Sequence, residues 1–173
     1  FNSELLNTQR VNNDKQERTE LSFFSSLDYN FNKISIRTAF RYLYRNEHED
    51  KFTPAVNVKM NLGKTYLRFS YAHGFRTPSL KEMYFNFVDI NHNIQGNSEL
   101  KPEHSKNLQI NFNSKINNNY DFNYKFFYNK INDFITLIQN DNTPNFEYIN
   151  IGNYKTLGTK LGLKFNLGNV NIN

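Results

Sequence analysis

The sequence predicts an all-β protein, an antiparallel up-and-down β-barrel that crosses a membrane. Three observations favour this fold class. Apolar and polar side chains alternate with a period of two over runs of roughly 10 to 20 residues, longer than most strands of soluble proteins. Short and long connections alternate along the chain. A mean hydropathy of −0.75 is combined with 16% aromatic residues, so Phe and Tyr must be separated from the polar residues in space.

The expected strands follow one another in a regular series. Residues 20–31 place Leu21, Phe23, Leu27, Tyr29 and Phe31 on one face. The next six expected strands carry, in order, Ile34 to Tyr44, Val56 to Leu62, Leu67 to Tyr71, Leu108 to Phe112, Tyr120 to Tyr128 and Ile149 to Leu167, and an eighth begins at 170–173. The opposite face carries Lys, Arg, Asn, Ser and Asp. We therefore expect one face to contact lipid and the other to line an aqueous lumen.

The connections are predicted to separate into two rims. The short ones are Asn32-Lys33, Gly63-Lys64, Asn117–Asn119 and Gly168-Asn169, and the long ones span 46–53, 76–104 and 139–146. Outer-membrane barrels have short periplasmic turns and long extracellular loops, with aromatic girdles at both interfaces. Tyr29, Phe31, Tyr42 and Tyr44 lie near expected strand ends and suit such girdles. The alternative is a soluble or cell-surface β-sandwich that binds or adheres to a partner through residues 76–104.

Other classes of protein find no support. The chain has no Cys, and it contains no run of 18 apolar residues that would indicate a transmembrane helix. It shows no phosphate-binding glycine loop, no His-Glu-x-x-His and no nucleophile-elbow serine, so an enzyme is not predicted. Its cations are spread along strands rather than gathered on a helix or groove, which does not favour nucleic-acid binding.

Four segments resemble, in order, sequence boxes of TonB-dependent outer-membrane receptors. Residues 75–84 (Phe-Arg-Thr-Pro-Ser-Leu-Lys-Glu-Met-Tyr) resemble that family's Phe-Arg-Ala-Pro-Ser-Leu box, and residues 96–103 (Gly-Asn-Ser-Glu-Leu-Lys-Pro-Glu) its Gly-Asn-Pro-x-Leu-x-Pro-Glu box. Residues 127–135 and 150–158 are similar to two later boxes. Thr77 and Ser98 depart from the pattern. The matching motif residues of the first two boxes are Phe75, Arg76, Pro78, Ser79, Leu80, Gly96, Asn97, Leu100, Pro102 and Glu103. Ser79 and Glu82 also have capping-box spacing, which predicts a helical turn after Pro78.

The resemblance implies a larger protein and a transport function. Such barrels have about 22 strands, so residues 1–173 are expected to be part of a barrel, with the plug domain and the closing strand outside this chain. Residues 76–104 would form a long extracellular loop. The implied function is active uptake of a scarce, bulky ligand (an iron-siderophore complex, haem or cobalamin) across a Gram-negative outer membrane. The implied partners are the lipid bilayer and TonB, which acts through the plug; no resident cofactor is implied.

Candidate ligand-binding residues lie in the long loop and along one strand. His92, between the first two boxes, is either a polar loop residue or a ligand of haem iron, since neutral imidazole commonly binds that metal. Arg37, Arg41 and Arg45 alternate on one strand and would either pair with carboxylates in the lumen or attract an anionic ligand. The remaining candidates are Arg76, Tyr84 and Phe87 of the loop.

Overall fold

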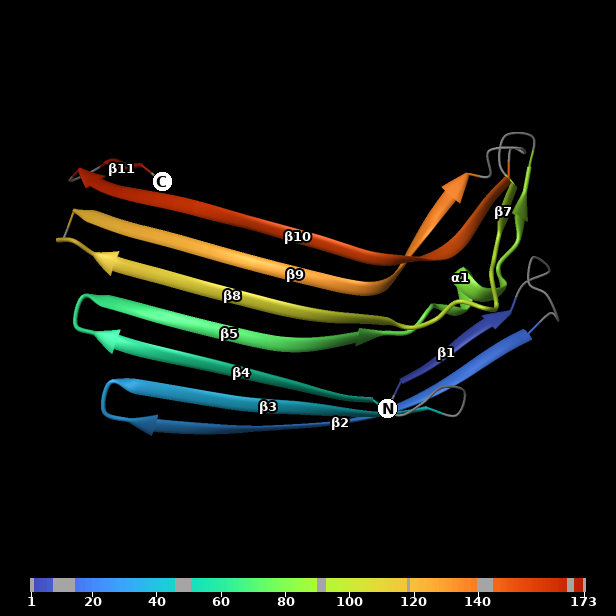
Figure 1. The fold of residues 1–173 in the computed structure, drawn as a ribbon, viewed down its shortest axis with the longest axis horizontal. Coiled ribbons are helices and arrows are strands. Elements are labelled where there is room, and N and C mark those ends of the chain that lie inside the picture. The colour runs from blue at the N-terminus through green and yellow to red at the C-terminus, as the bar shows by residue number, and fades with distance from the viewer. Residues whose placement is uncertain are drawn as a thin grey trace.

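The computed structural model describes residues 2–7, 15–45, 51–89, 93–117, 119–139, 145–167 and 170–172. All seven long strands expected from the sequence are present (Figure 1). They are β2 (Lys15–Phe31), β3 (Ile34–Arg45), β4 (Lys51–Leu62), β5 (Thr65–Arg76), β8 (Glu103–Lys115), β9 (Tyr120–Gln139) and β10 (Asn145–Leu167). The shorter elements are β1 (Asn2–Asn7), α1 (Leu80–Tyr84), β6 (Phe87–Val88), β7 (Asn93–Gln95) and β11 (Val170–Ile172).

The described strands form a single sheet. Its order is β1-β2-β3-β4-β5-β8-β9-β10-β7-β6, and β11 pairs with the end of β10. Consecutive long strands are antiparallel neighbours, as expected for a wall of an up-and-down barrel. Within the described ranges there is no second sheet packed against this one, which the β-sandwich alternative would require.

The tight turns lie together at one end of the sheet (Figure 1). Asn32 and Gly63 have φ values of 50° and 69°, the left-handed conformation that Asn and Gly adopt most readily. Asn117 accepts hydrogen bonds from the N–H groups of Asn119 and Tyr120 at 2.8 and 3.0 Å, which stabilises the third turn. The fourth expected turn, at residues 168–169, lies outside the described residues.

Two expected strand boundaries were wrong. The connection predicted over 46–53 is shorter, because β4 begins at Lys51 and its first residues continue the ladder with β3. β2 begins at Lys15 rather than Glu20, because its N-terminal part pairs with β1. Both differences arise from pairing partners that no local pattern reveals.

The apolar face of the sheet is uncovered. Phe23, Leu27 and Leu157 retain 59%, 70% and 68% of their exposure. Among residues whose burial is described, the buried apolar side chains are only Leu43, Pro78, Leu80, Met83, Leu100 and Ile135. The Phe and Tyr residues on this face therefore form an outward surface instead of a core, as lipid contact requires.

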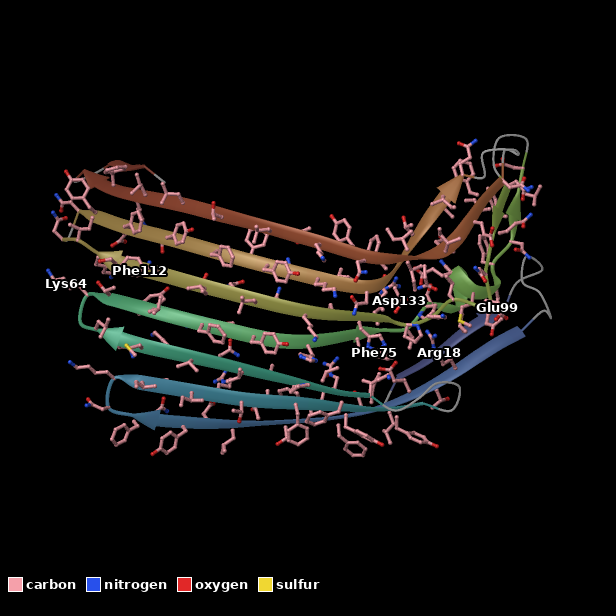
Figure 2. All side chains as sticks on the ribbon, viewed as in Figure 1. Arg18, Lys64, Phe75, Glu99, Phe112 and Asp133 are labelled. Carbon is pink, nitrogen blue, oxygen red and sulfur yellow. The ribbon has the colours of Figure 1, made fainter. Side chains whose placement is uncertain are left out.

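The end of the sheet that carries the long connections is bent. β9 and β10 turn away from the plane of the other strands there, and β7 runs beside the first residues of β10 (Figure 1). Asp133 lies at the bend with a φ of 53°. Figure 2 shows Arg18, Phe75 and Asp133 toward this end and Lys64 and Phe112 toward the other. No helix in the described part of the chain is long and apolar enough to cross a membrane.

Candidate functional site

The connection between β5 and β8 is fixed to the sheet by an ion-pair cluster around Arg76. Nε and Nη2 of Arg76 donate to the two carboxylate oxygens of Glu103 at 2.9 and 2.7 Å. Nη1 donates to both oxygens of Glu82 at 3.1 and 2.9 Å. Glu103 Oε1 also accepts a 2.8 Å hydrogen bond from the N–H of Ile135 on β9. One guanidinium thus joins β5, α1 and β8, and Glu103 extends the connection to β9.

Arg76 and Glu103 are both charged at neutral pH. Burial acts to raise the pKa of Glu103, but hydrogen bonds from Arg76 and from the Ile135 N–H outweigh it, so the pKa lies below its ordinary value. The hydrogen bond to Glu103 is the largest influence on Arg76 and raises the pKa of its guanidinium. Glu103 is the first residue of β8 and precedes Leu108 by five positions. Leu108 is the last apolar residue of the outward face toward this end of β8, so the cluster lies outside the apolar band.

A capping box starts α1 as predicted. Ser79 Oγ accepts from the Glu82 N–H at 3.2 Å, and Glu82 Oε2 accepts from the Ser79 N–H at 2.7 Å. Pro78 and Leu80 are fully buried beside the cap, and Arg18 Nη1 of β2 donates to the Pro78 carbonyl at 2.5 Å. Glu82 therefore caps the helix and pairs with Arg76, while Arg18 ties the segment to β2.

The segment at Gly96-Asn97 packs directly on α1. The N–H of Asn97 donates to the Glu82 carbonyl at 2.9 Å, and its side-chain Nδ2 donates to the Tyr148 carbonyl of β10 at 2.9 Å. A Cβ atom at Gly96 would lie 2.8 Å from the carbonyl carbon and oxygen of Met83 and from the Tyr84 nitrogen. Glycine is needed here because the two backbones approach closely.

The two remaining boxes meet at the bend. Asn150 Nδ2 donates to the carbonyls of Asp133 and Lys101 at 2.7 and 2.9 Å, and its Oδ1 accepts from the Lys101 N–H at 2.7 Å. A Cβ atom at Gly158 would lie 2.5 Å from the Phe127 ring, so that ring lies against the space that glycine leaves open. The sequence analysis placed Asn150 in the fourth box without assigning it a contact, and it missed the bend. The available signal was the shift of apolar residues in β9 from even positions, as at Tyr128, to odd positions, as at Ile131 and Ile135.

A small apolar core joins the first three boxes to β10. Met83, Leu100 and Ile135 are buried together, and Tyr84 and Tyr148 pack against them. These residues come from α1, the second box, β9 and β10. The motif residues thus act together as a docking device that we call the loop core: Met83, Leu100, Ile135, the Arg76–Glu82–Glu103 cluster, Gly96, Asn97 and Asn150.

The candidate ligand residues of the loop differ in position. Tyr84 is held by the loop core, and Phe87 lies in β6 with its ring stacked on Phe85 at 6.3 Å between centroids. The centroids of the Phe75 and His104 rings lie 5.1 Å apart, and Pro102 is half-buried. His92 lies outside the described residues.

The three candidate arginines of β3 are not equivalent. Arg37 forms an ion pair with Asp28 of β2 through its Nε at 2.5 Å and its Nη2 at 2.9 Å. Arg41 is exposed on the polar face and lines a hollow together with Glu20, Thr53 and Gly74. For Arg45 the structure describes only its backbone position in β3, opposite Glu20.

The register also assembles a row of cations on the polar face. Lys59, Arg68, Asn111, Lys125 and Lys160 lie opposite one another across β4, β5, β8, β9 and β10. Lys59 Nζ and Arg68 Cζ lie 4.9 and 5.9 Å from the centroid of the Tyr66 ring. We call these four cations the lumen row. No group of three His, Asp or Glu side chains within the described ranges could hold a metal ion.

Comparison with curated proteins identifies receptors that bind haemoglobin. The chain is 35% identical over 91 residues to the hemoglobin and hemoglobin-haptoglobin-binding protein C of Haemophilus influenzae, a match that covers 51% of this chain and 8% of that protein. It is 36% identical over 86 residues to the probable hemoglobin and hemoglobin-haptoglobin-binding protein 3 of the same species, covering 48% and 8%. The matched segments are thus a small part of either relative.

Solved structures share the fold at low sequence identity. The siderophore receptor PirA of Pseudomonas aeruginosa superposes with a TM-score of 0.84 at 14% identity, over 95% of this chain and 35% of that one. The hemophore receptor HasR of Serratia marcescens, in complex with its hemophore HasA and haem, gives 0.75 at 16% identity, over 92% and 33%. A family model described as TonB dependent receptor-like, beta-barrel, matches residues 2–173, nearly the whole chain. The chain therefore belongs to the TonB-dependent receptor β-barrel family.

Proposed function

We propose that this chain forms wall and loop of an outer-membrane receptor that takes up haem iron, with a haemoglobin-type protein as its source. The supporting observation is the 35–36% identity to haemoglobin-binding receptors over about half of the chain. The solved siderophore and hemophore receptors share only the fold, at 14–16% identity, and do not distinguish between ligands. Residues 76–104 are proposed as an extracellular loop held at the barrel rim by the loop core.

The location follows from the family. TonB-dependent receptor barrels are outer-membrane proteins of Gram-negative bacteria, so the apolar face contacts lipid. We propose that uptake is energised by TonB through a plug domain, as the family implies, and that residues 1–173 supply about a third of the barrel wall.

The test is growth of a haem auxotroph. The complete receptor is expressed in a Gram-negative haem auxotroph that lacks its own haem receptors, and haemoglobin or free haemin is the only haem supply. We expect growth on both that disappears when tonB is deleted. If the strain grew on neither haemoglobin nor haemin and imported a ferric siderophore instead, haem uptake would be refuted. The chain would then still belong to a receptor, but for a different ligand. Growth independent of tonB would refute energised transport.

His92 is proposed as a ligand of the haem iron. Substitution His92→Ala in the complete receptor is expected to abolish the Soret shift that follows haemin addition, because the axial imidazole is lost. His48→Ala, which removes a histidine from another expected connection, is the control and should retain the shift. An unchanged Soret shift and haemin affinity in His92→Ala would exclude the role.

Arg41 is proposed to attract anionic groups of the ligand into the lumen. It lines the hollow on the polar face, whereas Arg37 is already neutralised by Asp28. We expect Arg41→Gln to slow haemin capture severalfold at low salt, and added salt to remove the difference, because screening shortens the reach of the charge. Arg37→Gln is the matched control. Equal capture rates for wild type and Arg41→Gln at low salt would rule the role out.

A further inference from the structure

The apolar face carries a second row of cations, at its border on the long-loop side. Lys106 of β8 lies opposite Lys130 of β9, and Lys130 lies opposite Lys155 of β10. His73 of β5 extends the row on the other side, opposite Lys106. These four strands are adjacent in the sheet (Figure 1). Because directly opposite residues have Cβ atoms about 5 Å apart, we treat Lys106, Lys130 and Lys155 as one site, the outer lysine row.

The outer lysine row faces the lipid side and begins where the apolar residues stop. On β9 the outward residues Tyr120, Phe122, Tyr124, Phe126 and Tyr128 precede Lys130 at every second position. Two positions along each strand toward the tight turns, the outward residues are Tyr71, Leu108, Tyr128 and Leu157, which lie opposite one another in register. The span from Tyr120 to Tyr128 is about the 9–11 residues that a tilted strand needs to cross a bilayer. The lysines therefore lie at headgroup level, just beyond aromatic residues typical of the interface.

Among the described residues, no carboxylate on this face of β5, β8, β9 or β10 balances the charge of the lysines. The outward positions of β5 (65–75), β8 (104–114), β9 (120–132) and β10 (153–165) contain neither Asp nor Glu. Within the described part of the chain, none of the three lysines forms an ion pair, and His73 is engaged by the Tyr71 hydroxyl at 2.8 Å. Like charges directly opposite each other destabilise a sheet, so three such lysines require an anionic partner from outside it.

We propose that the outer lysine row binds the phosphate groups of anionic glycolipid headgroups in the outer leaflet. The partner must be anionic and must lie at the height where acyl chains end, and a headgroup phosphate meets both conditions. Lysine is a flexible point charge that suits a phosphate whose position varies. Adjacent lysines on three neighbouring strands hold the lipid against the wall, and the Tyr71 and Tyr128 rings pack beside its first acyl carbons.

The experiment measures lipid binding to the complete receptor in a neutral detergent. Bisphosphorylated lipid A, its dephosphorylated form and inorganic phosphate are compared by the rise in unfolding temperature and by native mass spectrometry. We expect wild type to bind bisphosphorylated lipid A, with affinity that falls as salt increases, and neither of the other two. The variant Lys106→Gln/Lys130→Gln/Lys155→Gln should bind about 100-fold more weakly, at roughly fivefold per lysine.

The matched control places the same charge change on the other face. Lys59→Gln/Lys125→Gln/Lys160→Gln alters the lumen row on β4, β9 and β10 and should leave lipid binding unchanged. Should the outer triple variant fail to fold, Lys130→Gln alone is read in the same way, with a fivefold loss. Equal lipid A binding by wild type and the outer variant would overturn the proposal. Equal stabilisation by inorganic phosphate would also overturn it, because the row would then be a site for free anions.

Discussion

Replacing Glu103 by alanine is expected to release the connection between β5 and β8 from the sheet. Glu103 is 8% exposed and accepts from Nε and Nη2 of Arg76 and from the N–H of Ile135. Its removal leaves the Ile135 N–H without that acceptor and Arg76 with Glu82 alone. Losing hydrogen bonds to a buried charged group costs several kcal/mol. Because Arg76 is half-exposed, we expect the free energy that holds the loop on the sheet to fall by about 2–4 kcal/mol.

The measurement is hydrogen exchange of the complete receptor. Peptides covering α1 and residues 133–136 should exchange about 30- to 1,000-fold faster in Glu103→Ala, because local opening becomes easier by the same free energy. Glu99→Ala removes an exposed carboxylate from the same loop and is the control. Equal protection of these peptides in wild type and Glu103→Ala would show that the cluster does not hold the loop.

The pH dependence has a definite sign. The folded-state pKa of Glu103 is lower than its ordinary value of 4.5, so the carboxylate stabilises the docked loop fully at pH values well above 4.5. The contribution is lost as the pH falls through the lowered pKa. We expect protection of α1 to decrease from roughly pH 5 downward in wild type. Glutamine does not titrate, so Glu103→Gln should lack the part of this decrease that comes from protonation of Glu103. Identical pH profiles of α1 protection in wild type and Glu103→Gln would show that Glu103 does not cause the decrease.

The strands were predictable because their signals are local. Period-two alternation located the seven long strands, and Asn32 and Gly63 marked turns whose left-handed backbone suits those residues. The turn of helix at Leu80–Tyr84 was predictable from Ser79 and Glu82, because a capping box joins residues only three positions apart.

The loop core and the two cation rows depend on contacts distant in sequence. The pairing of β7 with β10 joins Asn93 to Asn145, and Asn150 reaches Lys101. Neither contact leaves a periodic pattern. Alternation assigns Lys106, Lys130 and Lys155 to a face, but only the register of β8, β9 and β10 shows that they are opposite one another. The sequence analysis expected lysines on the polar face, so it predicted neither the outward position of these three lysines nor the site that they form.

Gly96→Ala is expected to separate the second box from α1. The new Cβ would lie 2.8 Å from three backbone atoms of Met83 and Tyr84, and backbone cannot move aside as a flexible side chain can. The chain must shift at Gly96, which strains the hydrogen bonds of Asn97 to the Glu82 and Tyr148 carbonyls. Overpacking of this kind costs about 1–3 kcal/mol, and Gly96→Val should cost more.

Proteolysis of the complete receptor on intact cells reads out this release. Lys81 lies within α1, so trypsin cuts after it only when the helix opens locally. We expect cleavage there to become about 5- to 150-fold faster in Gly96→Ala, in proportion to the population of the locally opened state. Gly152→Ala is the matched control, because a Cβ atom at that position has no heavy atom within 4 Å. If both alanine variants were cut at the wild-type rate, the close approach of the backbones at Gly96 would not be needed to dock the loop. The Arg76–Glu103 cluster would then have to hold the loop alone.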